Sequence, residues 1–496
     1  MAEAVRVAQH IPRRWRRGIS LDPRYQEPKG RATLWTRARR VLWSWWPWFV
    51  VAVATAYDDR WGWAFSAGAM AFVSYLVTPI ETPPQYGLEH EFSVDSDEFL
   101  TTITGASGVP LLSCTRIDVL HNGDEFYPVM LDEIGRAEAS ITIEAYIYWA
   151  GEIGRRFADA LAAKAREGIP VKILLDSVGS ATIGSEILET LEKGGCQLAW
   201  YNRIRWYTIG QFNHRTHRKS LIIDGRVGFT GGAGIADVWL GHAESPEHWR
   251  DTQVRIAGPA VTPLQTGFAQ NWLKTTGELL SGATYYPEHE CEQGLPSRGY
   301  GETGSPSRGF AATNLSVQTV MSSPESGASS VRLMHYLPIV CARRSICISN
   351  PYFVPDQAAI DTLVEARQRG VDVRIMVAGR HNDTWLARQN SRRLYGPLLR
   401  AGIQILEYNK TFMHQKTMVV DGLWVSIGTT NFDNRSFAHN EETSVCIKDA
   451  ELAAFMEQTF RVDMRACDRV ELEAWRKRGL LTKSLEAVAS LLEAQV

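Results

Sequence analysis

Two short segments of the chain carry histidine, lysine and aspartate at the same spacing. Residues 216–225 read THRKSLIIDG and residues 413–422 read MHQKTMVVDG, about two hundred residues apart. If each segment is a strand, its histidine and lysine lie on one face and its aspartate on the other, because neighbouring side chains alternate. Asp-Gly between two apolar runs is also typical of a hairpin turn. We therefore expect Asp224 and Asp421 to close turns, while each histidine and lysine project together.

A histidine beside a lysine suits chemistry at a phosphate. The lysine supplies positive charge, and the imidazole can attack phosphorus or transfer a proton near neutral pH. Two such pairs, brought together, allow one histidine to be the nucleophile and the other the general acid. Lysines can stabilise the charge that develops, and no Cys or His cluster has metal-ligand spacing, so we expect neither a metal nor a cofactor. The candidate catalytic residues are His217, Lys219, Asp224, His414, Lys416 and Asp421.

Further polar groups follow the two motifs at matching places. After the second motif, IGTTNFDNRSF offers backbone, hydroxyl and amide donors to a phosphate. The aligned stretch of the first copy, TGGAGIAD, has glycines there, whose backbone N–H groups can replace the missing donors. This difference predicts that the two halves of the site have separate jobs. The candidate phosphate-binding residues are Thr429, Asn431, Gly231 and Gly232.

Two carboxylates align downstream of the motifs. DTQV begins at Asp251 and ETSV begins at Glu442. We expect these carboxylates to hold the second nitrogen of each histidine and so to fix its tautomer, which completes the set of nucleophile, base and orienting group. The alternative is that each forms an ordinary surface salt bridge.

The sequence around the motifs is an internal duplication. ITIEAYIY from residue 141 and SICISNPYF from residue 345 predict strands, each followed by a helix that ends at a glycine, Gly168 or Gly370. GIPVKILLD and GVDVRIMVA supply the next strand of each copy. Strands that alternate with helices predict an α/β domain, built twice. The first copy alone contains RIRWYTIGQF (203–212), a loop that either contacts lipid headgroups or packs on its own aromatic residues.

Two apolar runs without charge lie near the start of the chain, at 41–57 and 61–80. A membrane-spanning helix needs about 20 apolar residues, so the second run is long enough and the first, with Pro47, is marginal. Tryptophans crowd the outer ends of both runs, as they do at membrane interfaces. We predict a transmembrane helical hairpin, with a buried hairpin of a soluble protein as the alternative.

Charge is distributed unevenly along the 496 residues. The formal net charge is -2, but residues 1–40 contain eleven basic and three acidic residues, which leaves 42 basic and 52 acidic residues for the rest. The basic start predicts a cytoplasmic N-terminus, and the hairpin returns the chain to the same side. An acidic body is a poor partner for nucleic acid. The seven cysteines include no CxxC pair and indicate reduced thiols.

The two H-x-K-x-x-x-x-D motifs resemble those of the phospholipase D superfamily. NGDEFYPVML (122–131), PYFVPD (351–356) and GTTNFDNRSF (428–437), together with the apolar hairpin, are similar to bacterial cardiolipin synthases. The resemblance covers about residues 112–465. It implies two phospholipase D-like α/β sandwich domains, one pseudo-twofold active site between them, a phosphohistidine intermediate and no metal.

The resemblance also implies a reaction and a location. A phosphatidyl group would pass from one phosphatidylglycerol to a second, giving cardiolipin and glycerol at the inner (cytoplasmic) membrane of a bacterium, with the catalytic domains facing the cytoplasm. His217 would be the nucleophile, and His414 would protonate the leaving glycerol and then activate the acceptor. Other possibilities are a hydrolase, a transferase that uses another alcohol, a nuclease, and an inactive membrane scaffold. The hairpin and the acidic body disfavour a nuclease, and the intact motifs disfavour a scaffold.

The sequence predicts six divisions of the chain. They are a basic cytoplasmic segment (1–40), a membrane hairpin (41–80), a first phospholipase D-like domain (112–280), a linker or flexible loop (281–309), a second phospholipase D-like domain (310–467) and a helical tail (468–496).

Overall fold

The computed structural model of the chain describes residues 45–58, 60–77, 88, 90–203, 214–289, 308–323 and 329–489. The predicted basic segment 1–40, the loop at 204–212 and the middle of the predicted linker, 290–307, lie outside these ranges.

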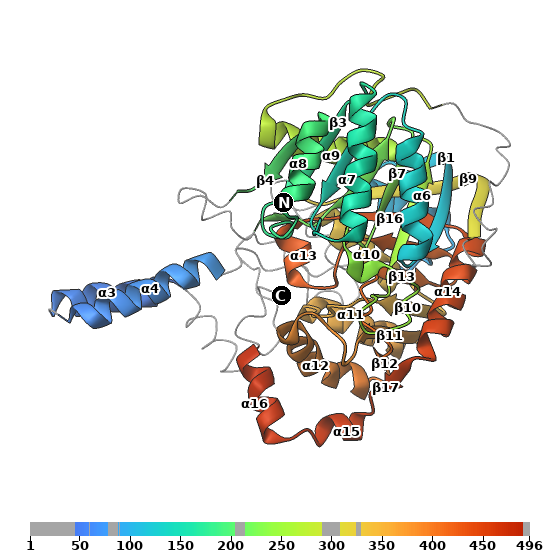
Figure 1. The fold of residues 1–496 in the computed structure, drawn as a ribbon. Helices are drawn as coiled ribbons and strands as arrows, with labels where there is room; N and C mark the ends of the chain where they lie inside the picture. The colour runs from blue at the N-terminus through green and yellow to red at the C-terminus, as the bar shows by residue number, and fades with distance from the viewer. Residues whose placement is uncertain are drawn as a thin grey trace, which may run out of the picture.

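Among the described residues, one sheet of fifteen strands runs through both copies (Figure 1). The strands of the first half are β1 (Leu112–His121), β2 (Ile141–Ala145), β3 (Val171–Asp176), β4 (Gln197–Tyr201), β6 (Lys219–Ile223), β7 (Val227–Gly231) and β8 (Thr252–Ala257). Those of the second half are β9 (Arg308–Met321), β10 (Ser345–Ser349), β11 (Asp372–Ala378), β12 (Gln404–Tyr408), β13 (Thr417–Val420), β14 (Trp424–Gly428), β16 (Thr443–Lys448) and β17 (Cys467–Arg469).

The strand order repeats on the two sides of the sheet centre. It is β17-β12-β11-β10-β13-β14-β16-β9-β1-β8-β7-β6-β2-β3-β4. Each half contains three parallel strands, β2-β3-β4 or β10-β11-β12, and an antiparallel hairpin, β6-β7 or β13-β14. The central strands β1 and β9 pair with each other and join the halves. The duplicated α/β architecture is therefore confirmed, and the two copies share a single sheet.

Helices cover the sheet, as the alternating pattern predicts. They are α6 (Gly123–Gly135), α7 (Glu152–Arg166), α8 (Ser185–Gly194) and α9 (Val261–Thr276) in the first half, and α10 (Ser329–Cys341), α11 (Gln357–Gln368), α12 (Trp385–Arg400), α13 (Asn434–Ala438) and α14 (Ala450–Met464) in the second. The helix α5 (Asp97–Ser107) precedes β1 but packs in the core of the second half. In α7 the residues Ile153, Phe157 and Leu161, one turn apart, are all fully buried. The chain leaves this helix at Gly168, which has a positive φ of 91° that glycine adopts readily.

The packing of the two halves is continuous. One apolar cluster contains Leu174 and Val254 from the first half together with Met376 and Val445 from the second. The short helices α15 (Leu472–Arg476) and α16 (Leu480–Ala489) follow β17, in the segment predicted as a helical tail.

The apolar runs near the start form two helices, α3 (Trp45–Tyr57) and α4 (Trp61–Val77). They lie side by side and apart from the sheet (Figure 1). Many of their large apolar side chains are exposed, including Phe49 at 54% and Phe65 at 81%. The helical hairpin is thus present, but the helices are 13 and 17 residues long, and none in the described ranges combines the length and apolar character needed to cross a bilayer.

Candidate active site

The aspartate of each motif lies in a hairpin turn, as the sequence predicts. Asp224 and Gly225 have φ of 56° and 63°, and Asp421 and Gly422 have φ of 56° and 61°. Two successive positive φ values are the mark of a type I′ turn, which matches the twist of the flanking strands. These turns join β6 to β7 and β13 to β14.

The two aspartate carboxylates hold backbone and do not face the histidines. Asp224 accepts hydrogen bonds from the backbone N–H groups of residues 138–140, just before β2. Asp421 accepts from those of residues 343–345, just before β10. About 16 Å of strand separates either aspartate from the lysine of its motif. Both aspartates therefore tie their hairpin to the neighbouring strand.

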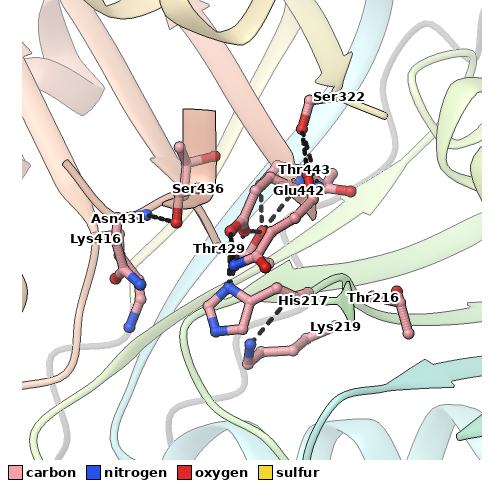
Figure 2. Close-up of polar contacts among 12 residues, drawn as sticks. Thr216, His217, Lys219, Ser322, Lys416, Thr429, Asn431, Ser436, Glu442 and Thr443 are labelled. Atoms are coloured by element: carbon pink, nitrogen blue, oxygen red, sulfur yellow. Dashed lines mark hydrogen bonds and ion pairs between the residues drawn. The ribbon is translucent and has the colours of Figure 1, made fainter. Parts of the chain in front are cut away.

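Each histidine is held by a carboxylate from the other half of the chain. Nδ1 of His217 lies 2.9 and 3.0 Å from the two carboxylate oxygens of Glu442 (Figure 2). Nδ1 of His414 lies 2.8 Å from Oδ2 of Asp251. Because a carboxylate only accepts, Nδ1 donates in both cases and Nε2 is left with a free electron pair. The crossed pairing makes one site out of two halves.

The two orienting carboxylates have different surroundings. Glu442 accepts hydrogen bonds from the Thr429 hydroxyl at 2.5 Å and from the Asn440 amide at 3.2 Å. Asp251 accepts from the indole N–H of Trp239 at 3.0 Å. Gly232, which aligns with Thr429, has no room for a side chain, because an added Cβ would lie 2.1 Å from Oδ1 of Asp251.

The four residues predicted to bind phosphate differ in what they contact within the protein. The Thr429 hydroxyl donates to Glu442, and the backbone N–H of Gly232 donates to the carbonyl of Thr252 at 3.2 Å. Gly231 lies at the end of β7, where a side chain would meet the backbone of β8. Asn431 lies on the same side of the site as Lys416 (Figure 2), and its side-chain oxygen has no hydrogen-bond partner among the described residues. That oxygen can only accept a hydrogen bond, so the predicted donation to a phosphate would have to come from the NH2 group of Asn431.

The two lysines are fixed in equivalent ways. Nζ of Lys219 donates to the carbonyl of His217 at 3.0 Å and lies 5.4 Å from the centre of the Tyr146 ring. Lys416 donates to the carbonyl of His414 and lies 6.0 Å from the centre of the Tyr352 ring. Each ammonium group has three N–H donors, so two remain for phosphate oxygens.

Burial controls the charge state of the site, because the side chains of its two histidines and two lysines are all less than a tenth exposed. It lowers the pKa of His217 to about 4 and that of His414 to about 3. Burial, followed by the charge of Lys416, lowers the pKa of Lys219 to about 7, and burial lowers that of Lys416 to about 8. At neutral pH both imidazoles are therefore neutral, which is the form that a nucleophile requires.

The orienting carboxylates remain ionised in the same surroundings. Burial acts to raise the pKa of Glu442, but the contact with His217, the charge of Lys219 and the hydrogen bond from Thr429 outweigh it and lower the pKa overall. The same opposition, with His414 as the main partner, lowers the pKa of Asp251. Ionised carboxylates hold the imidazole Nδ1–H and leave Nε2 as the nitrogen without a proton.

Three aromatic residues of the site do not belong to the motifs. The rings of Tyr146 and His217 lie 5.1 Å apart, and those of Tyr352 and His414 lie 6.2 Å apart. The repeated Tyr in ITIEAYIY and NPYF is the sequence signal for this pair, because both follow the equivalent strand. Trp239, which supports Asp251, has no counterpart in the second copy and no such signal.

Two further observations concern possible metal ligands and cysteines. Within the described ranges, no three His, Cys, Asp or Glu side chains gather closely enough to hold a metal ion. Cysteines 196, 341, 347, 446 and 467 are free thiols.

Comparison with known proteins agrees with this geometry. The family model described as "Cardiolipin synthase, PLD-like domain" matches residues 130–261 and 339–464. A cardiolipin synthase of Geobacillus thermodenitrificans is 33% identical over 384 residues, which cover 77% of this chain and 73% of that protein. A probable cardiolipin synthase of Bacillus subtilis is 32% identical over 412 residues, or 83% of this chain and 77% of that protein.

A solved structure shares the fold. The phosphatidylserine synthase of Haemophilus influenzae superimposes with a TM-score of 0.59 at 15% identity, over 81% of this chain and 100% of that one. On the matches of the family model and of the sequence relatives, the chain belongs to the cardiolipin synthase family of phospholipase D-like proteins.

Proposed function

We propose that the chain is a cardiolipin synthase, a phosphatidyltransferase that converts two molecules of phosphatidylglycerol into cardiolipin and glycerol. The observation that carries the proposal is the crossed site, in which two neutral histidines are each oriented by a carboxylate of the other half. Such a site has the two equivalent acid–base groups that a two-step transfer at phosphorus needs. The family match supplies the lipid substrate class.

In the first step, Nε2 of His217 attacks the phosphorus of one phosphatidylglycerol. The phosphorus–oxygen bond to the terminal glycerol breaks, and that oxygen takes a proton from Nε2 of His414. His414 is neutral in the free site and takes up this proton from solvent when the substrate binds, because the negative charge of the phosphodiester favours its protonated form. Lys219 and Lys416 donate to the phosphate oxygens as charge builds up on them.

In the second step, a hydroxyl group of the second phosphatidylglycerol attacks the phosphatidyl group on His217. His414 accepts the proton of that hydroxyl, the phosphorus–nitrogen bond breaks, and cardiolipin leaves. After the second step His217 is again neutral and His414 again protonated, as in the substrate complex, so the two steps balance. His217 takes the role of nucleophile in this scheme from the resemblance, since the two sites are nearly equivalent and their titrations are coupled.

We also propose that the hairpin of α3 and α4 inserts into the cytoplasmic membrane and holds the body on the cytoplasmic side. Support comes from the exposed apolar side chains on both helices and from Trp61 and Trp63, which are 67% and 72% exposed. Full-length protein in inverted membrane vesicles should stay with the lipid after an alkaline wash. Recovery in the wash would contradict insertion.

The proposed reaction is tested with detergent-purified, full-length protein and phosphatidylglycerol as the sole lipid. We expect equal amounts of cardiolipin and glycerol, with the same rate in EDTA, because the lysines carry the positive charge of the site. Phosphatidic acid as the sole product would identify a hydrolase. Adding a second alcohol tests for a different acceptor, which would appear as a phosphatidyl ester of that alcohol.

A further inference from the structure

The residue between histidine and lysine in the first motif, Arg218, points away from the active site. It is 2% exposed, and its guanidinium lies 3.1 Å from the carboxylate of Glu441. Glu441 directly precedes Glu442, the residue that orients His217. Because neighbouring side chains of an extended segment point to opposite sides, the Arg218–Glu441 pair lies behind the pair of His217 and Glu442. The segment of residues 217–218 and the segment of residues 441–442 are thus joined by one pair of side chains at the active site and by a second pair on the opposite side.

The two segments are also joined through their backbones. β5 (Arg215–Thr216) and β15 (Asn440–Glu441) pair as short parallel strands, one from each half of the chain. The N–H of His217 donates to the carbonyl of Glu441 at 2.9 Å. Residue 441 therefore holds the backbone of His217 with its carbonyl and Arg218 with its side chain. Any displacement of residue 441 would move the histidine and its orienting carboxylate.

The Arg218–Glu441 pair lies in a buried polar cluster. Its further contacts, between 2.5 and 2.9 Å, run from Arg218 to the carbonyls of Gly267 and Ser322, and to Glu441 from the Tyr201 hydroxyl and the Asn271 amide. A second carboxylate, Glu144, shares the Asn271 amide at 2.7 Å. Burial, and the charge of Glu441, raise the pKa of Glu144 to about 7. Without Arg218, the cluster would contain two buried carboxylates and no guanidinium to pair with them.

The second half has the same backbone arrangement with different side chains. The N–H of His414 donates to the carbonyl of Arg250, which precedes Asp251, at 2.8 Å. The middle residue of this motif is the neutral Gln415. Arg250 pairs with Asp463 of α14 at 3.2 Å, and Gln415 donates to the same carboxylate at 3.1 Å. In the first half, by contrast, the middle residue is itself charged and pairs directly across the two halves.

We infer that the ion pair of Arg218 and Glu441 positions His217, by locking the segment that carries this histidine onto the segment that carries its orienting carboxylate. The pair is a positioning device and touches no substrate. A buried ion pair is costly to form, and the neutral Gln415 of the other half shows that the middle residue of the motif need not carry a charge. The inference rests on the proposed function only in that His217 reacts with the lipid phosphate.

The test compares full-length Arg218→Gln, Glu441→Gln and the double variant with wild type in micelles that contain phosphatidylglycerol. Arg218→Gln gives the first motif the amide that the second carries. Each single change should lower kcat about fiftyfold, because small displacements of a reacting group are costly. KM should change less than about threefold, since neither residue touches substrate. The double variant should remain only about tenfold below wild type, because it leaves no buried charge without its partner.

A matched control separates positioning from general stability. Arg255 on β8 forms largely buried ion pairs with Glu133 at 2.6 Å and with Asp118 at 3.0 Å, in the same half but outside the contact between the two segments. Arg255→Gln should lower the melting temperature about as much as Arg218→Gln and keep kcat within about twofold of wild type. Equal losses of kcat in these two variants would overturn the inference.

Other outcomes also decide the question. A folded Arg218→Gln variant with kcat within threefold of wild type would overturn the inference. If that variant does not fold, the double variant decides, because wild-type kcat there would mean that the pair has no positioning role. If wild type makes phosphatidic acid instead of cardiolipin, the proposed function fails. The rate at which each variant forms phosphatidic acid then still tests the positioning of His217.

Discussion

The carboxylate that orients His217 can be tested by replacing a single oxygen atom. In Glu442→Gln the side chain keeps its size, its burial and one carbonyl oxygen. The Thr429 hydroxyl and the Asn440 amide, which now donate to Glu442, compete for that oxygen. The new amide N–H then faces Nδ1 of His217 and donates to it. The imidazole must carry its proton on Nε2, the atom that should attack phosphorus.

The size of the effect follows from the loss of the reactive tautomer. In a triad of similar geometry, the equivalent change lowers kcat by about 10⁴. The short contacts of 2.9 and 3.0 Å and the complete burial of Glu442 predict a loss of about 10³–10⁴ here, or about 4–5.5 kcal/mol in the activation free energy. KM should change little, because Glu442 binds the histidine and not the lipid.

The assay measures the initial rate of cardiolipin formation from phosphatidylglycerol over a range of lipid mole fractions. Glu457→Gln is the control, because Glu457 is a carboxylate on α14 that pairs with the exposed Arg461. The control should keep the wild-type kcat and melting temperature. A Glu442→Gln enzyme that retains more than a tenth of wild-type kcat would refute the orienting role of Glu442.

Three further predictions concern the pH dependence of activity, the pH dependence of stability and the motif aspartate Asp224. kcat/KM should fall above about pH 7–8, where Lys219 and Lys416 lose their protons; a rate profile that is flat between pH 6 and pH 9 would contradict this. His217 and His414 should make the free energy of unfolding decrease as pH falls from about 6.5 towards 4, because the histidines of the unfolded chain take up protons first. Asp224→Ala should cost about 3 kcal/mol of stability through its lost backbone hydrogen bonds, seen as a lower melting temperature, while kcat at a permissive temperature stays near wild type. A large loss of kcat without loss of stability would instead give Asp224 a catalytic role.

Much of the fold follows from local patterns in the sequence. The strands at 141–145 and 345–349, the helices that follow them and the Asp-Gly turns depend on residue periodicity and backbone preference, which act over a few residues. Duplication of the pattern then predicts two α/β units. Nothing local indicates that β1 and β9 pair and join the units into one sheet, because these strands meet across almost two hundred residues.

The site was predictable as a set of residues but not as an arrangement. Alignment identifies Asp251 and Glu442 as partners of the histidines, yet the exchange of carboxylates between the halves depends on how the halves pack. The expectation that Thr429 faces a phosphate treated its hydroxyl as free. In the fold, the buried Glu442 needs that donor, because a buried charge is costly without hydrogen bonds. Position 232 is a glycine because the Asp251 carboxylate fills the space that a side chain would occupy.

The most direct test of the two-histidine account is to locate the covalent intermediate. Full-length His414→Ala and His217→Ala are mixed with phosphatidylglycerol, quenched in alkali to preserve phosphohistidine, digested and analysed by mass spectrometry. If His217 is the nucleophile, a slowly formed, acid-labile phosphatidyl adduct appears on His217 in the His414→Ala enzyme and no adduct appears in the His217→Ala enzyme. An adduct on His414 in the His217→Ala enzyme would contradict this assignment.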